Sequence, residues 1–251
     1  MRRIRAAVFG VLGAVVVAWP AAWAGAEEIP ESHRDAIKEG LERINPGLYP
    51  ESLRPTPLEG LYEVVVNGRL VYMSEDGRYL IQGEILDLDG QHSISEEYHR
   101  EQRLDTLADL PEEELVVYPA ADGGDHVVTI FTDVECPFCQ RLHAEMRSLQ
   151  ERGIEVRYVL MPRSVPSSAY RKSVAVYCAE DRRSAMDAAK GGELQGDGGE
   201  ECPNPIQEHV QIAETLGIRA TPTLISKDGR MHEGYLSPED LEAFLKGELE
   251  H

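Results

Sequence analysis

The clearest hydrophobic pattern lies in the second half of the chain. The continuous apolar run Val127–Phe131 predicts a strand that is buried on both faces, and Ile154–Leu160 predicts a second strand. Between these runs, Leu142, Met146 and Leu149 recur at the spacing of an amphipathic helix. The order of strand, helix and strand indicates an α/β domain.

More helices and a hairpin follow within the same predicted domain, which we assign to residues 116–251. A Gly/Asp-rich loop is expected over 191–199, because these residues offer little to bury. The remaining predicted elements are helices over 167–190 and 206–216, strands at Thr223–Ile225 and Met231–Tyr235, and a last helix after Ser237.

The N-terminal part has a different pattern. Glu31–Ile44 has helical apolar spacing, and Pro46-Gly47 stops it. Asn67-Gly68 and Asp76-Gly77 are hairpin-turn signals between β-rich runs. Residues 27–90 therefore predict a helix with a small antiparallel sheet, an α+β domain that is small for a stable core of its own, so we expect it to pair with a second copy. The β-rich runs are 61–66, 70–73 and 79–86.

Residues 91–115 are polar, acid-rich and helix-prone, and they predict a linker helix between the two domains. Leu104, Leu107 and Leu110 recur at helical spacing, and the helix is expected to begin near Ser95. The segment also fits the first helix of the second domain, and the sequence leaves that alternative open.

The first 26 residues have the pattern of a secretory signal. The basic start Met1–Arg5 precedes an apolar stretch of about 14 residues and then small residues in A-x-A register. Cleavage is expected after Ala24 or Ala26. The alternative is a membrane anchor, but the run is shorter than the roughly 20 apolar residues that a span needs. We therefore expect export through the inner membrane without stable membrane insertion afterwards.

The net negative charge of the chain argues against some classes of binding partner. The 251 residues contain 45 acidic and 25 basic side chains, for a formal net charge of −20. Removal of residues 1–26 takes away three arginines and no acid, which changes the charge to −23. The acid excess argues against a nucleic-acid binder, since phosphate neutralisation needs clustered Lys and Arg. In an exported chain, the four cysteines can form lasting disulfides.

The motif Cys136-Pro137-Phe138-Cys139 follows the first predicted strand and opens a helix. Free N–H groups and the dipole at a helix N-terminus favour a thiolate, so Cys136 is the candidate nucleophile. Cys139 lies one turn further on and is the candidate resolving thiol; exchange would pass through a mixed disulfide. The alternatives are a purely structural disulfide and a zinc site, which the lack of a second close cysteine pair disfavours. No metal or other cofactor is expected.

Thr221-Pro222 lies between a predicted helix and a predicted strand, downstream of the cysteine motif. The arrangement is similar to that of thioredoxin-like proteins, which place a cis-proline loop beside the active cysteines. We therefore expect a cis bond, although only ~5–6% of X–Pro bonds in folded proteins are cis. The Thr221 backbone could then pair with an extended substrate segment.

The other two cysteines, Cys178 and Cys202, lie after the motif. If paired, they close a loop of about 25 residues, which contributes about 3 kcal/mol in the chain-entropy model. The alternative is a second redox centre. His143, on the predicted helix that begins at Cys136, is expected to be structural.

These features together resemble the periplasmic thiol:disulfide isomerases of the DsbC/DsbG family over essentially the whole mature chain. The residues that carry the resemblance are Phe131-Thr132-Asp133, Cys136 to Cys139, Leu142-His143, Met146, Val156-Arg157-Tyr158, Met161-Pro162-Arg163, Cys178-Ala179 with Cys202, Thr221-Pro222-Thr223, Leu61 to Val64 and Asp76 to Gly83.

The resemblance implies a cystatin-like α+β dimerisation domain at 27–90, a linker helix at 91–115 and a thioredoxin-like α/β domain at 116–251 with a helical insertion at about 163–216. It also implies a V-shaped homodimer, in which the N-terminal domains pair, and a non-catalytic Cys178–Cys202 bridge. The substrate-binding residues expected around the cysteine pair are Thr221, Pro222, Pro137 and Phe138.

The implied function is isomerisation or reduction of disulfides in unfolded or misoxidised exported proteins of the periplasm. An inner-membrane electron donor of the DsbD type is expected to keep the pair reduced. Pro137-Phe138 is closer to the Pro-Tyr of DsbG than to the Gly-Tyr typical of DsbC. A sulfenic acid reductase that protects single cysteines and a dimeric holdase chaperone therefore stay open as alternatives.

Overall fold

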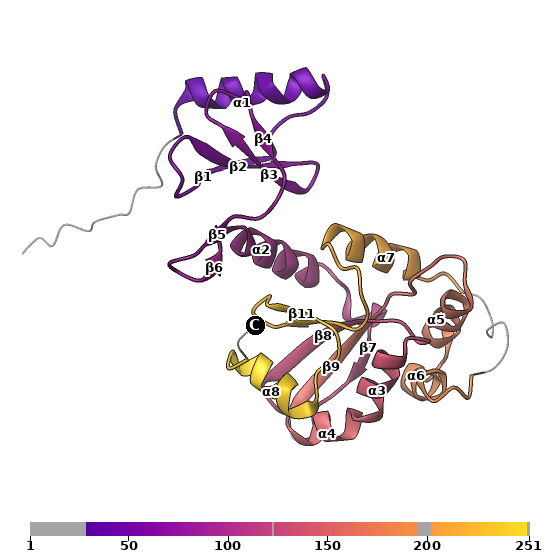
Figure 1. The fold of residues 1–251 in the computed structure, drawn as a ribbon. Coiled ribbons are helices and arrows are strands. Elements are labelled where there is room, and N and C mark those ends of the chain that lie inside the picture. The colour runs from indigo at the N-terminus through magenta and orange to yellow at the C-terminus, as the bar shows by residue number, and fades with distance from the viewer. Residues whose placement is uncertain (1–28, 122, 195–201, 250–251) are drawn as a thin grey trace, which may run out of the picture. The chain divides into compact units, whose positions relative to one another are not determined.

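The computed structural model describes residues 29–121, 123–194 and 202–249 (Figure 1). The predicted signal peptide at 1–26 and most of the loop predicted at 191–199 lie outside these residues. The described chain forms two compact units, 29–67 with 71–81 and 68–70 with 82–249. Within the described ranges, no helix is long and apolar enough to cross a membrane.

In the first unit, one helix lies across an antiparallel sheet of four strands in the order β1-β2-β3-β4 (Figure 1). The bounds of α1 and β2 are those predicted: α1 keeps helical apolar spacing, and β2 is a continuous β-rich run. The elements are α1 (Glu31–Ile44), β1 (Ser52–Pro55), β2 (Leu61–Val66), β3 (Arg69–Ser74) and β4 (Leu80–Ile81).

A tight turn and a small core fix the first unit. Asn67 and Gly68 join β2 to β3 with φ values of 50° and 69°, as a type I′ hairpin turn requires. Ile37 and Leu41 of α1 pack on Met73 and neighbouring valines of the sheet, and all are almost fully buried.

Gly77 lets α1 approach the turn between β3 and β4. Its φ is +63°, and a Cβ atom at this position would lie 1.9 Å from the Ala36 carbonyl oxygen. The Arg43 guanidinium donates a hydrogen bond to the Gly77 carbonyl at 2.8 Å. The predicted turn glycine therefore also serves the contact between helix and sheet.

The segment 79–86, predicted as one strand, forms only short pieces. β4 ends at Ile81, and β5 (Leu86–Asp87) pairs with β6 (His92–Ser93) instead of extending the sheet. Gly83 lies between the two pieces and weakens a continuous strand. β1 was not predicted, because it is short, ends in a proline and lacks apolar alternation.

The second unit is built on a mixed sheet with the strand order β11-β10-β8-β9-β7. β8 and β9 pair in parallel, and the other neighbours pair antiparallel. The strands are β7 (Val116–Tyr118), β8 (His126–Thr132), β9 (Ile154–Leu160), β10 (Thr223–Ser226) and β11 (Met231–Glu233). The helices are α3 (Pro137–Ala144), α4 (Met146–Glu151), α5 (Ser168–Cys178), α6 (Arg182–Lys190), α7 (Ile206–Thr215) and α8 (Pro238–Lys246).

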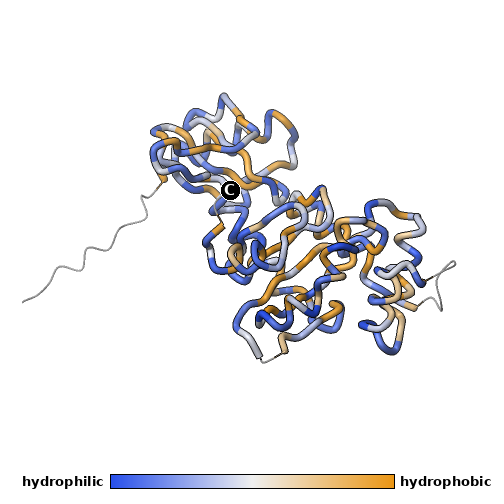
Figure 2. The backbone as a smooth tube through the Cα atoms, turned by 60° about the horizontal axis from the view of Figure 1, so that its bottom comes forward, coloured by the Kyte–Doolittle hydropathy of each residue, from blue (hydrophilic) through white to orange (hydrophobic). Residues whose placement is uncertain are grey.

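Alternate residues of the central strands face the two sides of this sheet. Val128 and Ile130 belong to a core with α3, α4, α5, α6 and α8, whereas Phe131 belongs to a second core with α7. In Figure 1, α7 and α3 accordingly lie on opposite faces of the sheet. Figure 2 shows orange, hydrophobic stretches at the centre of this unit. The prediction that β8 is buried on both faces is confirmed.

The linker helix α2 (Ile94–Ala108) groups with the second unit. It begins one residue before the expected Ser95, because Ser93 is the N-cap and its hydroxyl accepts a hydrogen bond from the Glu96 amide at 3.2 Å. Ser95 instead accepts from the Ile85 amide at 2.9 Å.

Two arginines fasten α2 to the β10–β11 hairpin. Arg103 is almost fully buried, donates to the Gly229 carbonyl at 2.6 Å and pairs with Glu96. Arg100 pairs with the Asp228 carboxylate at 2.9 Å. The helix therefore has a fixed contact with the sheet domain.

Candidate active site

Cys136 lies at the N-cap of α3, directly after the loop that follows β8. Pro137 occupies the first turn, where its missing N–H is not needed. The Cys136 side chain is 4% exposed and sits at the positive end of the helix dipole. Sequence and structure thus agree on the position of this cysteine.

Asp133 shapes the loop before Cys136. Its carboxylate is buried and accepts hydrogen bonds from the amides of Glu135 at 2.8 Å and Arg163 at 3.0 Å. The Arg163 guanidinium lies 3.6 Å from the same carboxylate. The positioning role of Asp133 was not predicted, although the sequence Phe131-Thr132-Asp133 was noted.

The structure brings Cys136 and the Thr221-Pro222 loop together, 85 positions apart in the chain. The Thr221–Pro222 bond is cis, as the sequence predicts, and the Cys136 thiol donates to the Thr221 carbonyl at 3.2 Å. A second cis bond, Val165–Pro166, was not predicted.

The surroundings of Cys136 favour its thiolate. Burial raises the pKa of the thiol, but interactions with the Thr221 side chain, with Cys139 and with the Phe138 amide outweigh burial and hold the pKa below its ordinary value. A lower thiol pKa increases the fraction of thiolate at a given pH and makes the sulfur a better leaving group.

The second thiol of the motif has the opposite character. Cys139 is 1% exposed, and burial raises its pKa, although the Lys190 charge and a hydrogen bond from Thr132 act against that rise. Both cysteines are free thiols. The pair therefore combines an activated outer thiol with a sheltered inner one.

Lys190, which sequence reasoning missed, lies beside this pair at the end of α6. Its ammonium donates to the Thr132 hydroxyl at 2.6 Å and to the Asp133 carbonyl at 2.7 Å. The side chain is 5% exposed, and burial lowers its pKa to about 8. The only signal in the sequence is that Lys190 falls on the same helix face as the apolar Met186.

Comparison with known proteins places this site in a family. Residues 113–247 match the model of a thioredoxin-like domain, and residues 21–96 match that of a disulfide bond isomerase protein N-terminal domain. The chain is 33% identical over 212 residues to the thiol:disulfide interchange protein DsbC of Dickeya dadantii, across 84% of this chain and 85% of the relative. This chain belongs to the DsbC family of thiol:disulfide interchange proteins.

A further relative and a solved structure also match. The DsbC protein of Escherichia coli K12 is 31% identical over 211 residues, which cover 84% of this chain and 86% of the relative. A disulfide interchange protein from Neisseria gonorrhoeae, known from a crystal structure, matches with a TM-score of 0.49 and 28% identity. That match covers 55% of this chain and 98% of the other.

The surface next to the DsbC-type cysteine pair is partly apolar. Phe138 is 59% exposed and stands between the two cysteines in the sequence. Glu135, which would disfavour a nearby thiolate, is instead held by the Lys172 ammonium at 2.8 Å and the Ser168 hydroxyl at 2.7 Å. These two hydrogen bonds lower the Glu135 pKa, and the lysine offsets its charge.

Cys178 and Cys202 are bonded to each other through their sulfur atoms, with their Cα atoms 5.8 Å apart. The bridge joins the end of α5 to the segment before α7. It connects the ends of a loop of which residues 195–201 lie outside the described ranges.

His143 of α3 belongs to a polar cluster with Tyr158, Asp187 and Tyr118. Its ring nitrogens lie 3.2 Å from the Tyr158 hydroxyl and 3.0 Å from the Asp187 carboxylate, which also accepts from the Tyr118 hydroxyl at 2.6 Å. Burial lowers the His143 pKa, so the ring is neutral near neutral pH. These contacts give it a structural setting.

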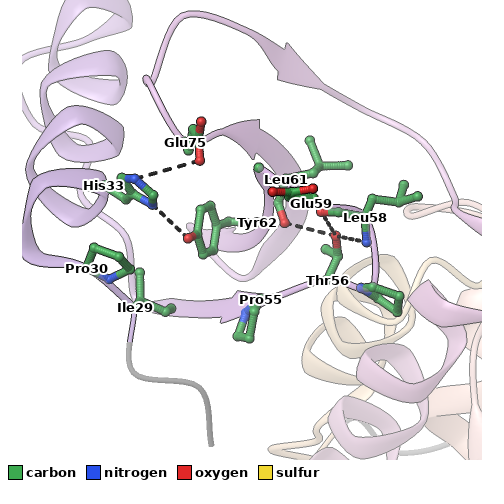
Figure 3. A pocket seen from close by; sticks show the side chains of 12 residues that line it. Ile29, Pro30, His33, Pro55, Thr56, Leu58, Glu59, Leu61, Tyr62 and Glu75 are labelled. Carbon is green, nitrogen blue, oxygen red and sulfur yellow. Dashed lines mark hydrogen bonds and ion pairs between the residues drawn. The ribbon is translucent and has the colours of Figure 1, made fainter.

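The first unit of this DsbC-family chain has a surface pocket of about 530 Å³ (Figure 3). Among its polar lining groups, a His33 ring nitrogen lies 2.8 Å from the Tyr62 hydroxyl, and the other lies 3.7 Å from the Glu75 carboxylate. The Thr56 hydroxyl donates to the Leu61 carbonyl at 2.9 Å. These groups satisfy one another, and we assign no chemistry to the pocket.

Proposed function

We propose that this chain is a thiol:disulfide isomerase and reductase that acts on misfolded or misoxidised exported proteins through Cys136 and Cys139. The observation that carries the proposal is geometric: Cys136 lies at the N-cap of α3, 3.2 Å from the Thr221 carbonyl, and Cys139 is almost fully buried one helical turn further on. An activated outer thiol can attack a substrate disulfide, and a sheltered inner thiol can resolve the product.

The reaction begins when the Cys136 thiolate attacks one sulfur of a substrate disulfide. A Cys136–substrate bond forms, the substrate S–S bond breaks, and the second substrate sulfur leaves with the electron pair. In isomerisation, that thiolate attacks another disulfide and Cys136 is finally released unchanged. In reduction, Cys139 attacks Cys136, so two electrons pass from the cysteine pair to the substrate.

The residues around Cys136 support binding of an extended substrate segment. The Thr221 carbonyl lies 3.2 Å from the Cys136 sulfur, so a substrate strand paired with the Thr221 backbone would bring its disulfide to that sulfur. Pro137, Phe138 and Pro222 complete the proposed contact surface, with Phe138 as the exposed apolar group.

The proposed assembly is a homodimer through the N-terminal domain at 27–90, with 91–115 as linker and 116–251 as catalytic domain. Support comes from β4, an edge strand of the first sheet, which leaves backbone groups free for pairing. Its residues Leu80 and Ile81 expose 37% and 50% of their surface, and Leu86, five positions on in the sequence, exposes 59%. Burial of such side chains favours association.

The proposed location is the periplasm, reached by cleavage of the signal at 1–26. A disulfide such as Cys178–Cys202 persists in an oxidising compartment. An inner-membrane reductase of the DsbD type is the proposed electron donor. Thiol trapping in intact cells tests this point, since the proposal expects Cys136 and Cys139 mainly as free thiols, whereas a net oxidant would keep them bonded.

A second candidate is a sulfenic acid reductase, which Pro137-Phe138 between the cysteines favours by its likeness to DsbG. Cys136 would condense with a sulfenic acid to a mixed disulfide and release water, and Cys139 would then resolve it. A protein carrying one oxidised cysteine and no disulfide is the substrate that distinguishes this activity from isomerisation.

The test of the main proposal is reactivation of scrambled ribonuclease by Cys136→Ser and Cys139→Ser variants. We expect no reactivation by Cys136→Ser and partial isomerase activity without net reduction by Cys139→Ser. Suppression of aggregation is measured in parallel, because a holdase chaperone would keep both functions after loss of Cys136. Full reactivation by Cys136→Ser would overturn the proposal.

We propose a structural role for the Cys178–Cys202 bridge. Replacing both residues by alanine is expected to lower the free energy of unfolding by about 3 kcal/mol, from the loop that the bond closes. Ribonuclease reactivation by the folded variant should be unchanged. A parallel loss of reactivation in fully folded protein would instead indicate a second redox centre.

A further inference from the structure

The segments that surround Cys136 are basic, although the chain as a whole is acidic. The formal net charge of the chain is −20. Residues 161–179, which follow β9, nevertheless contain three cations and no acid, and residues 215–227, which include the Thr221-Pro222 loop, contain two cations and no acid. A local charge opposite to that of the whole chain attracts anionic groups to this part of the surface.

The two acids that precede Cys136 are offset within the protein. The Asp133 carboxylate is buried and accepts hydrogen bonds from the amides of Glu135 at 2.8 Å and Arg163 at 3.0 Å. The Glu135 carboxylate accepts a hydrogen bond from the Lys172 ammonium at 2.8 Å. Neither acid therefore cancels the other cations of the surrounding segments.

Arg163 and Arg219 lie on the two loops that flank Cys136. The strand β8, which leads to Cys136, lies between β9 and β10, and its end is aligned with the end of β9 and the start of β10. Arg163 follows β9 by three residues, and Arg219 precedes β10 by four. The amides of Arg163 and Cys136 both donate to Asp133, at 3.0 Å and 3.2 Å. On the other side, the Thr221 carbonyl lies 3.2 Å from the Cys136 sulfur.

The guanidinium groups of both arginines are accessible to a ligand. Arg163 exposes 61% of its side chain, and the Asp133 carboxylate lies 3.6 Å from its Nε, beyond hydrogen-bonding distance. Arg219 is exposed and has no hydrogen-bond or ion-pair partner among the described residues. A guanidinium has five N–H donors in a planar fork that matches the two oxygens of a carboxylate.

We propose that Arg163 and Arg219 form a recognition surface that selects substrates with aspartate or glutamate close to the reacting cysteine. The inference rests on the proposed function, because it names the substrate class of the same site. Arg219 is two residues from Thr221, which is at most about 7 Å along an extended chain. A substrate segment paired with the Thr221 backbone would therefore present its acidic side chains within about three positions of its cysteine.

The proposed contacts leave the chemistry of exchange unchanged. The arginines keep their protons and form ion pairs with substrate carboxylates, while the bonds that form and break are those between sulfur atoms. Complementary charges at the rim of a binding surface act mainly on the rate of association, and salt screens them. The expected effect is therefore a salt-dependent difference in the second-order rate constant between acidic and basic substrates.

The test uses the reduced full chain and two synthetic peptides, each with one cysteine carried as a 2-pyridyl disulfide. One peptide has aspartate at the two positions on each side of the cysteine, and the other has lysine. Thiopyridone release, followed by absorbance, gives the rate constant for each peptide, which is divided by that for mercaptoethanol, a neutral thiol. We expect the aspartate peptide to react at least about threefold faster after this correction. The preference should disappear near 1 M salt, where the screening length is about 3 Å.

Variants assign this preference to the two arginines. Arg163→Gln combined with Arg219→Gln should lower the corrected ratio at least about twofold. Arg219→Gln alone breaks no polar contact among the described residues and should lower the ratio in part, so it serves as the test if the change at Arg163 disturbs the loop around Asp133. Lys227→Gln removes one charge at the opposite end of β10 and is the matched control, which should keep the wild-type ratio.

Equal corrected rate constants for the two peptides in the wild-type chain would overturn the inference. A preference that stays unchanged in folded Arg163→Gln, Arg219→Gln protein, or in Arg219→Gln protein, would equally overturn it. Failure of the proposed function has a different signature, because Cys136→Ser would then release thiopyridone from both peptides as fast as the wild-type chain.

Discussion

Cys136 and Cys139 show how position alone separates two chemically identical side chains. Both are buried, and burial by itself raises the pKa of each thiol. Cys136, at the helix N-cap, receives enough hydrogen bonds to reverse the effect, whereas Cys139 lies deeper and keeps a raised pKa. The order of reactivity therefore follows from the first turn of one helix.

This difference predicts the pH dependence of alkylation. Because a lowered pKa means that the thiolate persists as pH falls, Cys136 should be modified at a lower pH than a free cysteine, whose pKa is about 8.5. Cys139 should need a higher pH, since its pKa is raised. Mass spectrometry after brief treatment with iodoacetamide across pH measures both midpoints, and equal midpoints would contradict the assignment.

The sequence could identify those residues of the site that stand in a short motif or at a predicted junction between elements. Cys136, Pro137 and Cys139 stand in one motif, and Thr221-Pro222 lies at a predicted junction of helix and strand. Lys190 has no such signal, because its burial depends on where α6 packs against the loop after β8. A lysine at the end of a helix is ordinarily solvated, and only the tertiary fold makes this one part of the site.

At the scale of elements, segments with a strict period were predictable and short edge elements were not. α1, β2 and β9 have the predicted bounds, since α1 and β9 bury apolar positions at regular spacing and β2 is a continuous β-rich run. β1 and β7 are too short to show a period and were missed. The predicted strand at 79–86 was wrong in extent, because its apolar residues are exposed on an edge and do not mark a buried face.

Gly77 provides a test of how α1 is held on its sheet. Gly77→Ala should destabilise the first unit strongly, by at least about 2 kcal/mol, because its Cβ would meet the Ala36 carbonyl at 1.9 Å in addition to the strain of a positive φ. Gly68→Ala is the matched control, with φ +69° and nothing within 4 Å, and should cost about 1 kcal/mol.

Chemical unfolding of the two variants, followed by circular dichroism, measures this difference. Equal losses of unfolding free energy would show that the close approach of α1 to the β3–β4 turn contributes nothing.

At the scale of the whole molecule, the two units differ in what they contain. The second unit holds the cysteine pair and both cores that support it, and the first holds a small core with an exposed apolar edge. Acid excess is greater in the N-terminal part: residues 27–115 contain 22 acidic and 8 basic side chains, and 116–251 contain 23 and 14. Pairing of the first unit would give one molecule two dithiol sites.

The proposed dimer is tested at its edge strand. Ile81→Lys together with Leu86→Lys places charges among apolar groups that the dimer would bury, so light scattering should change from twice the chain mass to a monomer mass at micromolar concentration. Ile44→Lys, at a residue that is 61% exposed at the end of α1, is the matched control and should stay dimeric. A wild-type monomer would contradict the assembly.

The central claim is that Cys136 is the thiol that attacks substrate. It is tested most directly by trapping the mixed disulfide in a Cys139→Ala variant, which cannot resolve it, and locating the adduct by mass spectrometry after reaction with scrambled ribonuclease. The account predicts ribonuclease peptides joined to Cys136 and none joined to Cys178 or Cys202. An absence of trapped adduct, or an adduct on another cysteine, would contradict it.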